Sequence, residues 1–220
     1  MIPYSSDRPV AIAAIETRIA VACRWNSYYG VFDDRVDGGI FHRCLLWRRG
    51  EDEEELTRIA FLPGRNRKVP SWSWMSRKGG IDYLDPPFGK VEWELAEIQL
   101  PEHLGQPEFE VEINEGADIG LLAIARDFEI PGGDENDDFE LIYDDDEHES
   151  FDEQPFQCVI VAMSRDLRAA PQKTYYVLIV AQIAAWDEAR GGIIYERVGV
   201  GRLPGSYIAL DHPGIEGLLC

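Results

Sequence analysis

His42 and Cys44 are the residues whose types and spacing come nearest to a nucleophilic pair. A Cys–His dyad needs the thiol and the imidazole in hydrogen-bond contact, with the pKa of the thiol lowered. If the segment is extended, both side chains lie on one face, but their backbones are roughly 7 Å apart at the rise of a strand. We therefore expect a structural role. As metal ligands they would need two further donors, and His103, His148 and His212 are each isolated in the sequence.

Trp72 and Trp74 alternate with two serines, which predicts an extended strand with both indoles on one face. The pair belongs either to the core or, together with Tyr83, to a ligand-binding groove, because aromatic side chains dominate small-molecule and peptide sites. Asp82 and Asp85 are three residues apart, which points them to opposite faces of a strand and disfavours an acid–base pair. The candidate ligand-binding residues are Trp72, Trp74, Asp82 and Tyr83.

No complete catalytic motif occurs in the chain. The glycines from Gly199 to Gly205 faintly resemble a phosphate loop, but their spacing is not G-x-G-x-x-G, and Pro204 stands where a helix would begin. Nucleophile-elbow, zinc-protease and Walker sequences are absent. The four cysteines form no C-x-x-C pair, so neither a zinc ribbon nor a redox motif is encoded. We therefore predict no catalytic residue, no metal ligand and no cofactor.

A leading helix and a series of strands must position these residues. Ser6 and Asp7 are good N-cap types, and the isoleucines that follow at helical spacing predict a helix ending near 23–26. Beyond residue 30, apolar runs at 44–47 and 56–61 and strands at 71–74, 81–84, 91–95, 109–113, 119–125, 156–162, 174–183 and 193–200 are expected. The last two form an antiparallel hairpin, with a bulge or strand end at Gly199 and Gly201 and one more short strand after it.

The expected fold is mainly β, an antiparallel barrel or sandwich, because no repeated β-helix-β pattern appears. Residues 1–30 would hold the helix that packs on a β-rich domain over 31–220. Within that domain, residues 131–155 form an acidic insertion, with twelve acidic residues and no Lys or Arg between Asp134 and Glu153. Like charges at this density favour a solvated loop with little burial. Calcium binding and partner binding are the alternatives; the ligand order of an EF-hand is missing. Phe139, Leu141 and Tyr143 alternate as in a short strand.

Charge narrows the possible partners. The net charge is −20, and about −8 remains once the −12 of the acidic stretch is subtracted, an ordinary value for a domain. An acidic surface repels phosphate backbones and anionic membranes, so we expect neither a nucleic acid nor a membrane as partner. The N-terminal residues do not resemble a signal peptide, and the scattered cysteines suit a reducing compartment. We therefore expect a cytoplasmic protein.

Several runs resemble the stretch downstream of the HET domain in fungal heterokaryon-incompatibility (HET) proteins. They are Leu-Leu-Trp-Arg-Arg at 45–49, Val-Pro-Ser-Trp-Ser-Trp at 69–74 and Gly-Gly-Ile-Asp-Tyr at 79–83. The helix beginning near Asp7 and the run from Tyr195 to Gly201 are also similar, but Pro-Ser-Trp-Ser-Trp is the specific motif. Proteins of this family act in non-self recognition between fungal strains and trigger cell death. The effector role belongs to an N-terminal, TIR-related HET domain that nothing in this chain matches, so no catalytic residue is carried over.

Three functional hypotheses follow. The first is a non-enzymatic accessory module that senses or docks a protein partner and regulates the effector domain of a HET-type protein. The second is a barrel that binds a small hydrophobic ligand, either as a binding protein or as an enzyme of fungal secondary metabolism, with its pocket lined by the aromatic residues around Trp72, Trp74 and Tyr83. The third is a degenerate fragment without an independent role.

Overall fold

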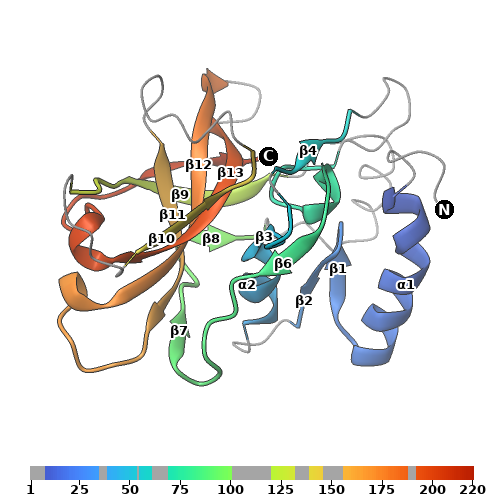
Figure 1. Ribbon diagram of the computed structural model, residues 1–220, viewed down its shortest axis with the longest axis horizontal. Coiled ribbons are helices and arrows are strands. Elements are labelled where there is room, and N and C mark those ends of the chain that lie inside the picture. Colours follow the sequence, from blue (N-terminus) through green and yellow to red (C-terminus); the bar gives the residue numbers. More distant parts are fainter. Residues whose placement is uncertain are drawn as a thin grey trace.

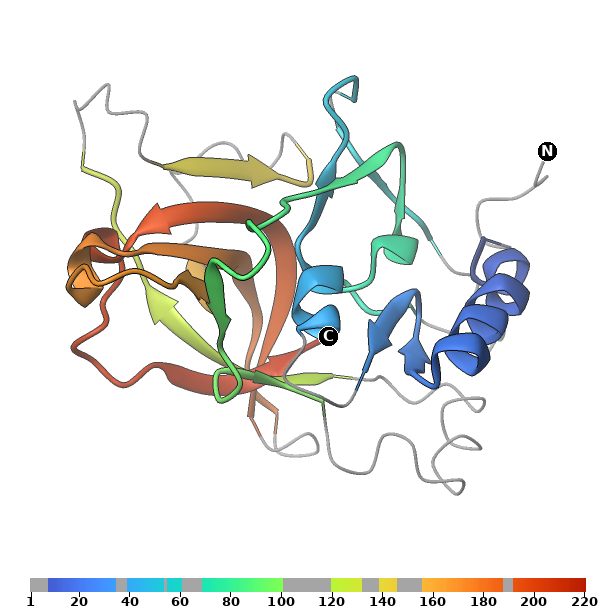
Figure 2. The same ribbon diagram turned by 90° about the horizontal axis from the view of Figure 1, so that it is seen from below.

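The computed structural model describes residues 8–34, 39–53, 55–60, 69–100, 120–131, 139–145, 156–187 and 192–220. The helix α1 (Arg8–Cys23) lies at one end of the molecule and a β-barrel at the other, and short elements of residues 26–83 lie between them (Figure 1). Figure 2 shows the same order from below. The prediction of a mainly β fold with a barrel and an N-terminal helix is confirmed.

A ring of five strands closes the barrel, because β9 pairs with both β11 and β14. The neighbours are antiparallel except for β13 and β14, which are parallel. Closure removes the free sheet edges within the ring. The ring consists of β9 (Leu121–Asp127), β11 (Gln157–Ser164), β12 (Thr174–Asp187), β13 (Gly192–Pro204) and β14 (Ile215–Leu219). Three strands add to it: β7 (Val91–Trp93) on β11, β8 (Ile98–Gln99) on β9 and β10 (Glu140–Tyr143) on β13.

The hairpin of β12 and β13 was predicted from the sequence, and so was its bulge. Ile179 pairs with Gly199 whereas Val180 pairs with Arg197, so the register shifts by one residue beside Gly199. Gly199 and Gly201 have a second role: a Cβ atom at either position would overlap the backbone of β10. The two glycines therefore let β10 lie close to β13.

Short paired elements of residues 26–83 lie between α1 and the barrel. They are β1 (Asn26–Tyr28) with β2 (Val31–Asp33), β3 (Trp47–Arg49) with β6 (Ile81–Tyr83), β4 (Thr57–Arg58) with β5 (Arg77–Lys78), and the helix α2 (Ile40–Leu45). Three 3-10 turns complete the described elements: η2 (Trp74–Ser76), η4 (Ala170–Gln172) and η5 (Gly205–Tyr207). The contact of α1 with this part includes a hydrogen bond from Gly30 N to Glu16 Oε1 at 2.9 Å.

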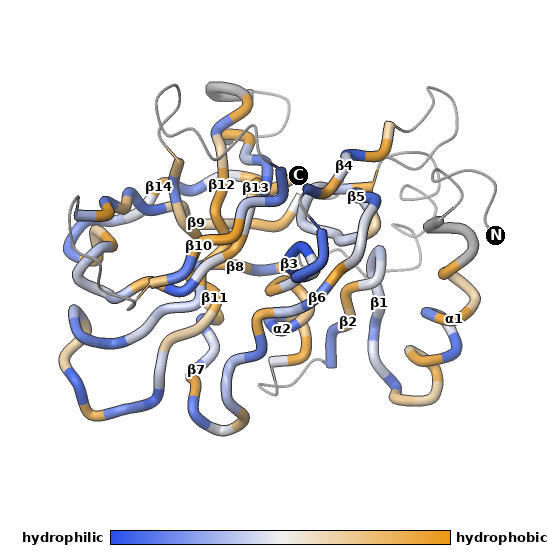
Figure 3. The backbone as a smooth tube through the Cα atoms, in the orientation of Figure 1, coloured by the Kyte–Doolittle hydropathy of each residue, from blue (hydrophilic) through white to orange (hydrophobic). Residues whose placement is uncertain are grey.

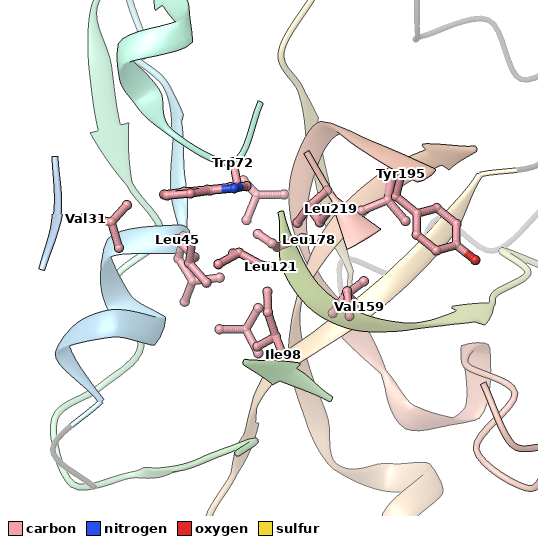
Figure 4. Packing of buried hydrophobic residues seen from close by; sticks show 14 of the residues in the cluster. Val31, Leu45, Trp72, Ile98, Leu121, Val159, Leu178, Tyr195 and Leu219 are labelled. Carbon is pink, nitrogen blue, oxygen red and sulfur yellow. The ribbon is translucent and has the colours of Figure 1, made fainter. Parts of the chain in front are cut away.

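One hydrophobic cluster fills the barrel and continues into residues 26–83. Ala125, Val159 and Leu178 are cross-strand partners, so they share the inner face of the ring, and all three are buried. Trp72 and Leu45 reach the same cluster from outside the ring (Figure 4). The interior of the barrel is therefore packed with side chains from both parts of the molecule.

A second cluster covers the opposite face of β11, β12 and β13. Cys158 and Ile179 pair across two strands and alternate with the inward-facing residues. Side chains from β10 and η5, including Tyr143 and Tyr207, pack over them. The long barrel strands are thus apolar on both faces, and Figure 3 shows the concentration of hydrophobic residues along β12.

The predicted strand at residues 71–74 is wrong. The backbone forms a turn that enters η2, and the hydroxyl of Ser73 caps this 3-10 helix by accepting a hydrogen bond from Met75 N at 3.1 Å. The same hydroxyl donates to Tyr29 O at 2.6 Å. Serine side chains that bond the nearby backbone compete with strand pairing.

Other boundaries also differ from the expectations. The apolar run at 44–47 begins in α2 and ends in β3, and Gly39, at φ +75°, lets the chain turn into that helix. The closing strand β14 was not predicted. The expected strand at 109–113 lies outside the described residues. The remaining predicted strands correspond to β6, β7, β9, β11, β12 and β13.

Candidate binding surface

Trp72 and Trp74 lie in different surroundings. Trp72 is fully buried in the first cluster, edge-on to Tyr29 with 6.3 Å between ring centroids, and its carbonyl oxygen accepts a hydrogen bond from Trp47 Nε1 at 2.8 Å. Trp74 is half-buried and donates from Nε1 to Gly30 O at 3.3 Å. The core prediction is therefore confirmed for Trp72, and the two indoles do not share a strand face.

His42 and Cys44 lie on the helix α2 and not on an extended segment, which corrects the expectation that they share one face. Residues two apart in a helix point to different sides. His42 Nε2 donates to the carbonyl oxygen of Glu94 at 2.9 Å, and burial lowers the pKa of the imidazole. Burial raises the pKa of the Cys44 thiol, which is the opposite of what a nucleophile requires. The positions on the helix and the two pKa shifts therefore do not fit a nucleophilic Cys–His dyad.

A fully buried arginine joins the barrel to residues 26–83. Arg197 on β13 donates from Nη1 to Asp144 Oδ2 at 3.0 Å and from Nη2 to the carbonyl oxygen of Trp47. Its guanidinium lies over the Trp47 ring, 3.1 Å from the centroid. Burial lowers the pKa of Arg197 to about 10, which still leaves it charged at neutral pH. We call Arg197, Trp47 and Asp144 the buried triad.

Asp144 belongs to the segment that we predicted to be a solvated loop, and for residues 139–145 that prediction is wrong. The Asp144 backbone accepts from Leu56 N at 2.8 Å and donates to Val198 O at 2.9 Å. Arg77 pairs with Asp145 at 3.1 Å. The alternation of residues 139, 141 and 143 does form a strand, β10. The acidic residues of 132–138 and 146–155 lie outside the described residues.

Asp82 and Tyr83 are exposed on β6. Asp82 accepts a hydrogen bond from Arg48 Nη2 at 3.1 Å, and Tyr83 pairs with Trp47 across β3 and β6. Desolvation raises the pKa of the Tyr83 hydroxyl to about 12, so the side chain is a neutral phenol at physiological pH. Both residues can offer hydrogen bonds and aromatic surface to a partner, and they lead directly into the loop from β6 to β7.

Arg43 of α2 holds that loop. Its Nη1 donates to Asp85 Oδ1 at 2.5 Å and its Nη2 to the Pro86 carbonyl oxygen at 3.0 Å. The same guanidinium lies 4.9 Å from the centroid of the Phe88 ring and 5.0 Å from that of Trp93. We call Arg43, Trp93 and Asp85 the exposed triad. Phe88 lies at its outer end and is 88% exposed.

The exposed triad is connected to the core through stacked rings. Trp93 stacks on His42 with 5.8 Å between centroids and 29° between planes, and His42 contacts Phe41 at 5.2 Å. Phe41 belongs to the first hydrophobic cluster. A Cβ atom at Gly39 would overlap the Trp93 indole, so this glycine makes room for the stack. The loop is thereby fixed to rigid elements.

Sequence reasoning named Asp82 and Tyr83 but missed Arg43, Phe88 and Trp93. One signal was present: residues 85–89 read Asp-Pro-Pro-Phe-Gly, which places a large aromatic residue inside a turn, where polar residues are usual. The contacts of Arg43 with a loop more than forty residues away had no local signal.

Comparisons with known proteins gave no relative: no family model, no curated protein and no solved structure matches the chain. Within the part of the chain that the structure describes, no group of three His, Cys, Asp or Glu side chains is arranged to hold a metal ion. None of the described helices has the length and apolar character needed to cross a membrane.

Proposed function

We propose that this chain is a non-enzymatic accessory module that binds a protein partner and, in a cytoplasmic HET-type protein of fungi, regulates the effector domain. The observation that carries the proposal is Phe88, a large aromatic side chain that is exposed yet held by a preorganised loop. Exposed aromatic residues on rigid supports bind proteins well, because little conformational entropy is lost on association.

The surroundings of the other candidate residues also favour this proposal. Trp72 and His42 are occupied in the packing of the core, and the Cys44 thiol has a raised pKa. The filled barrel favours a protein partner over a small hydrophobic ligand in the interior. The four cysteines are free thiols, which suits the cytoplasm, and the acidic charge disfavours nucleic acid.

Two measurements test the function. The purified chain should not consume NAD, since the residues that the HET family would use lie in a domain that this chain does not match. NAD hydrolysis that survives repurification and is abolished by Asp82→Asn would overturn the non-enzymatic assignment.

Co-expression with a HET effector domain in a fungal host should change the rate of cell death. An unchanged rate would contradict the regulatory role.

A further inference from the structure

We propose that the β6–β7 surface, formed by Asp82, Tyr83, Asp85 and Phe88, docks on a protein whose apolar pocket takes the Phe88 ring and whose rim carries lysine or arginine. This inference rests on the proposed function and adds to it the location of the interface and the chemistry of the partner.

The apolar pocket is inferred from how Phe88 is held. Arg43 contacts the loop at three points: the Asp85 carboxylate, the Pro86 carbonyl oxygen and the Phe88 ring. A hydrogen bond from Lys90 N to Pro87 O at 3.0 Å closes the turn, and one from Arg165 N to Lys90 O at 2.7 Å ties its end to the barrel. Pro86 and Pro87 restrict the backbone further. The ring therefore projects outward from a fixed base, the geometry of an anchor that fills a partner's pocket.

The basic rim is inferred from which member of each ion pair faces the solvent. The side chain of Arg43 is 18% exposed, whereas that of its partner Asp85 is 82% exposed. The side chain of Arg48 is also 18% exposed. It pairs with Asp82 and Glu51, whose side chains are 52% and 81% exposed. The arginines are thus the covered members and the carboxylates the exposed ones, so an approaching protein meets the carboxylates of Asp85 and Asp82 before it meets either guanidinium group. A positively charged rim would complement it and accelerate association.

A second copy of the chain is a less suitable partner for this surface than a different protein. Two identical surfaces would bring the same carboxylates together, and each chain carries a net charge of −20. Like charges placed opposite each other across an interface are costly. We therefore commit to a different protein of opposite surface charge.

The experiment uses photocrosslinking in host cells that produce the full chain. A photoreactive phenylalanine analogue replaces Phe88 in one variant, Ile183 in a second and Val21 in a third. Ile183 and Val21 are exposed apolar residues in the second half of β12 and on α1, so they are matched controls. The captured protein is identified, purified and titrated against the wild-type chain and substituted variants.

We expect capture from position 88 and not from 183 or 21. Phe88→Ala should raise Kd by about 30-fold, which is the effect of losing a hot-spot residue. Ile183→Ala should raise Kd by less than about twofold. Affinity should fall as salt is raised, and less steeply for Asp82→Asn than for the wild type.

Other outcomes overturn the inference. Capture only from 183 or 21, an unchanged Kd for Phe88→Ala, or affinity that does not respond to salt would place the interface elsewhere and leave the proposed function standing. Crosslinking to a second copy of the chain would overturn the assigned partner chemistry. Capture from none of the three positions would contradict both the surface and the proposed function.

Discussion

Two arginines of this protein each lie over a tryptophan ring and pair with an aspartate, but only one of the two aspartates is buried. Arg197 lies over Trp47 and pairs with Asp144, and both charged side chains are at most 1% exposed. Arg43 lies over Trp93 and pairs with Asp85, whose carboxylate faces the solvent. The chemistry of the two triads is alike, so the difference in burial determines what each can do.

Because of its burial, the buried triad is necessary for the stability of the fold. The carboxylate of the exposed triad remains accessible to a binding partner. Removing two charges from water costs several kcal/mol per ion, and only a well-formed pair offsets that cost. Breaking such a pair leaves an uncompensated buried charge. An exposed pair gains little from its contact, about 0–1 kcal/mol, and its carboxylate can exchange partners at small cost. We therefore assign the buried triad to the fold and the exposed triad to binding.

The largest expected effect is at Asp144. Asp144→Ala should lower the free energy of unfolding by about 3–5 kcal/mol, because Arg197 would keep its charge without its buried partner. Asp85→Ala, the matched change in the exposed triad, should cost about 1 kcal/mol or less. Urea unfolding of both variants gives the comparison. Replacing both members, as Arg197→Met with Asp144→Leu, should restore part of the loss. Equal midpoints for Asp144→Ala and Asp85→Ala would abolish the distinction between the triads.

The tryptophan pair gives a second comparison. Trp72→Ala should lower the free energy of unfolding by about 3–5 kcal/mol, since it removes a fully buried indole from the junction of the barrel with residues 26–83. Trp74→Ala should cost less, because this indole is half-buried. Denaturant midpoints for the two variants are the measurement. A near-normal midpoint for Trp72→Ala would show that the junction does not depend on core packing.

A smaller effect is expected from pH at His42, the ring beneath Trp93. The pKa of His42 is lowered, mainly by burial, against the opposing effects of its bond to the Glu94 carbonyl oxygen and of the carboxylates of Glu94, Asp33 and Asp34. The unfolded chain protonates this histidine near pH 6.5, whereas the folded chain does so only at lower pH. The unfolded state therefore binds more protons in that range, and stability should fall as pH drops below about 6.5.

His42→Gln should flatten the decline in urea midpoint between about pH 7.5 and about pH 5.5, because it removes the group whose pKa is lowered by folding. Identical slopes for the wild type and His42→Gln would mean that the stacked imidazole does not contribute to the pH dependence.

Local patterns predicted every strand of the barrel ring except β14. The run that became β12 is rich in β-branched and aromatic residues, and its hairpin with β13 needs only contacts close in the sequence. The α1 helix followed from N-cap residues and isoleucine spacing. The serine–tryptophan run was misassigned because alternation alone does not reveal that Ser73 caps a 3-10 turn and bonds Tyr29.

Long-range pairing set the limit for the candidate site. The sequence pattern predicts Asp144 to be one of twelve solvated acidic residues. No nearby residue indicates that Arg197 is its partner. In the same way, Arg43 gave no sign of the loop that it holds through Asp85 and Phe88. The charge density of residues 134–153 predicts solvent exposure for the segment as a whole. It does not show that Asp144 is buried, because that depends on its ion pair with Arg197.

The most direct test of the division between fold and binding is a pair of measurements on Phe88→Ala. The free energy of unfolding should change by no more than about 0.5 kcal/mol, as for a surface substitution, while Kd for the captured partner rises about 30-fold. A variant that unfolds as easily as Trp72→Ala, or that binds the partner as tightly as the wild type, would contradict the account.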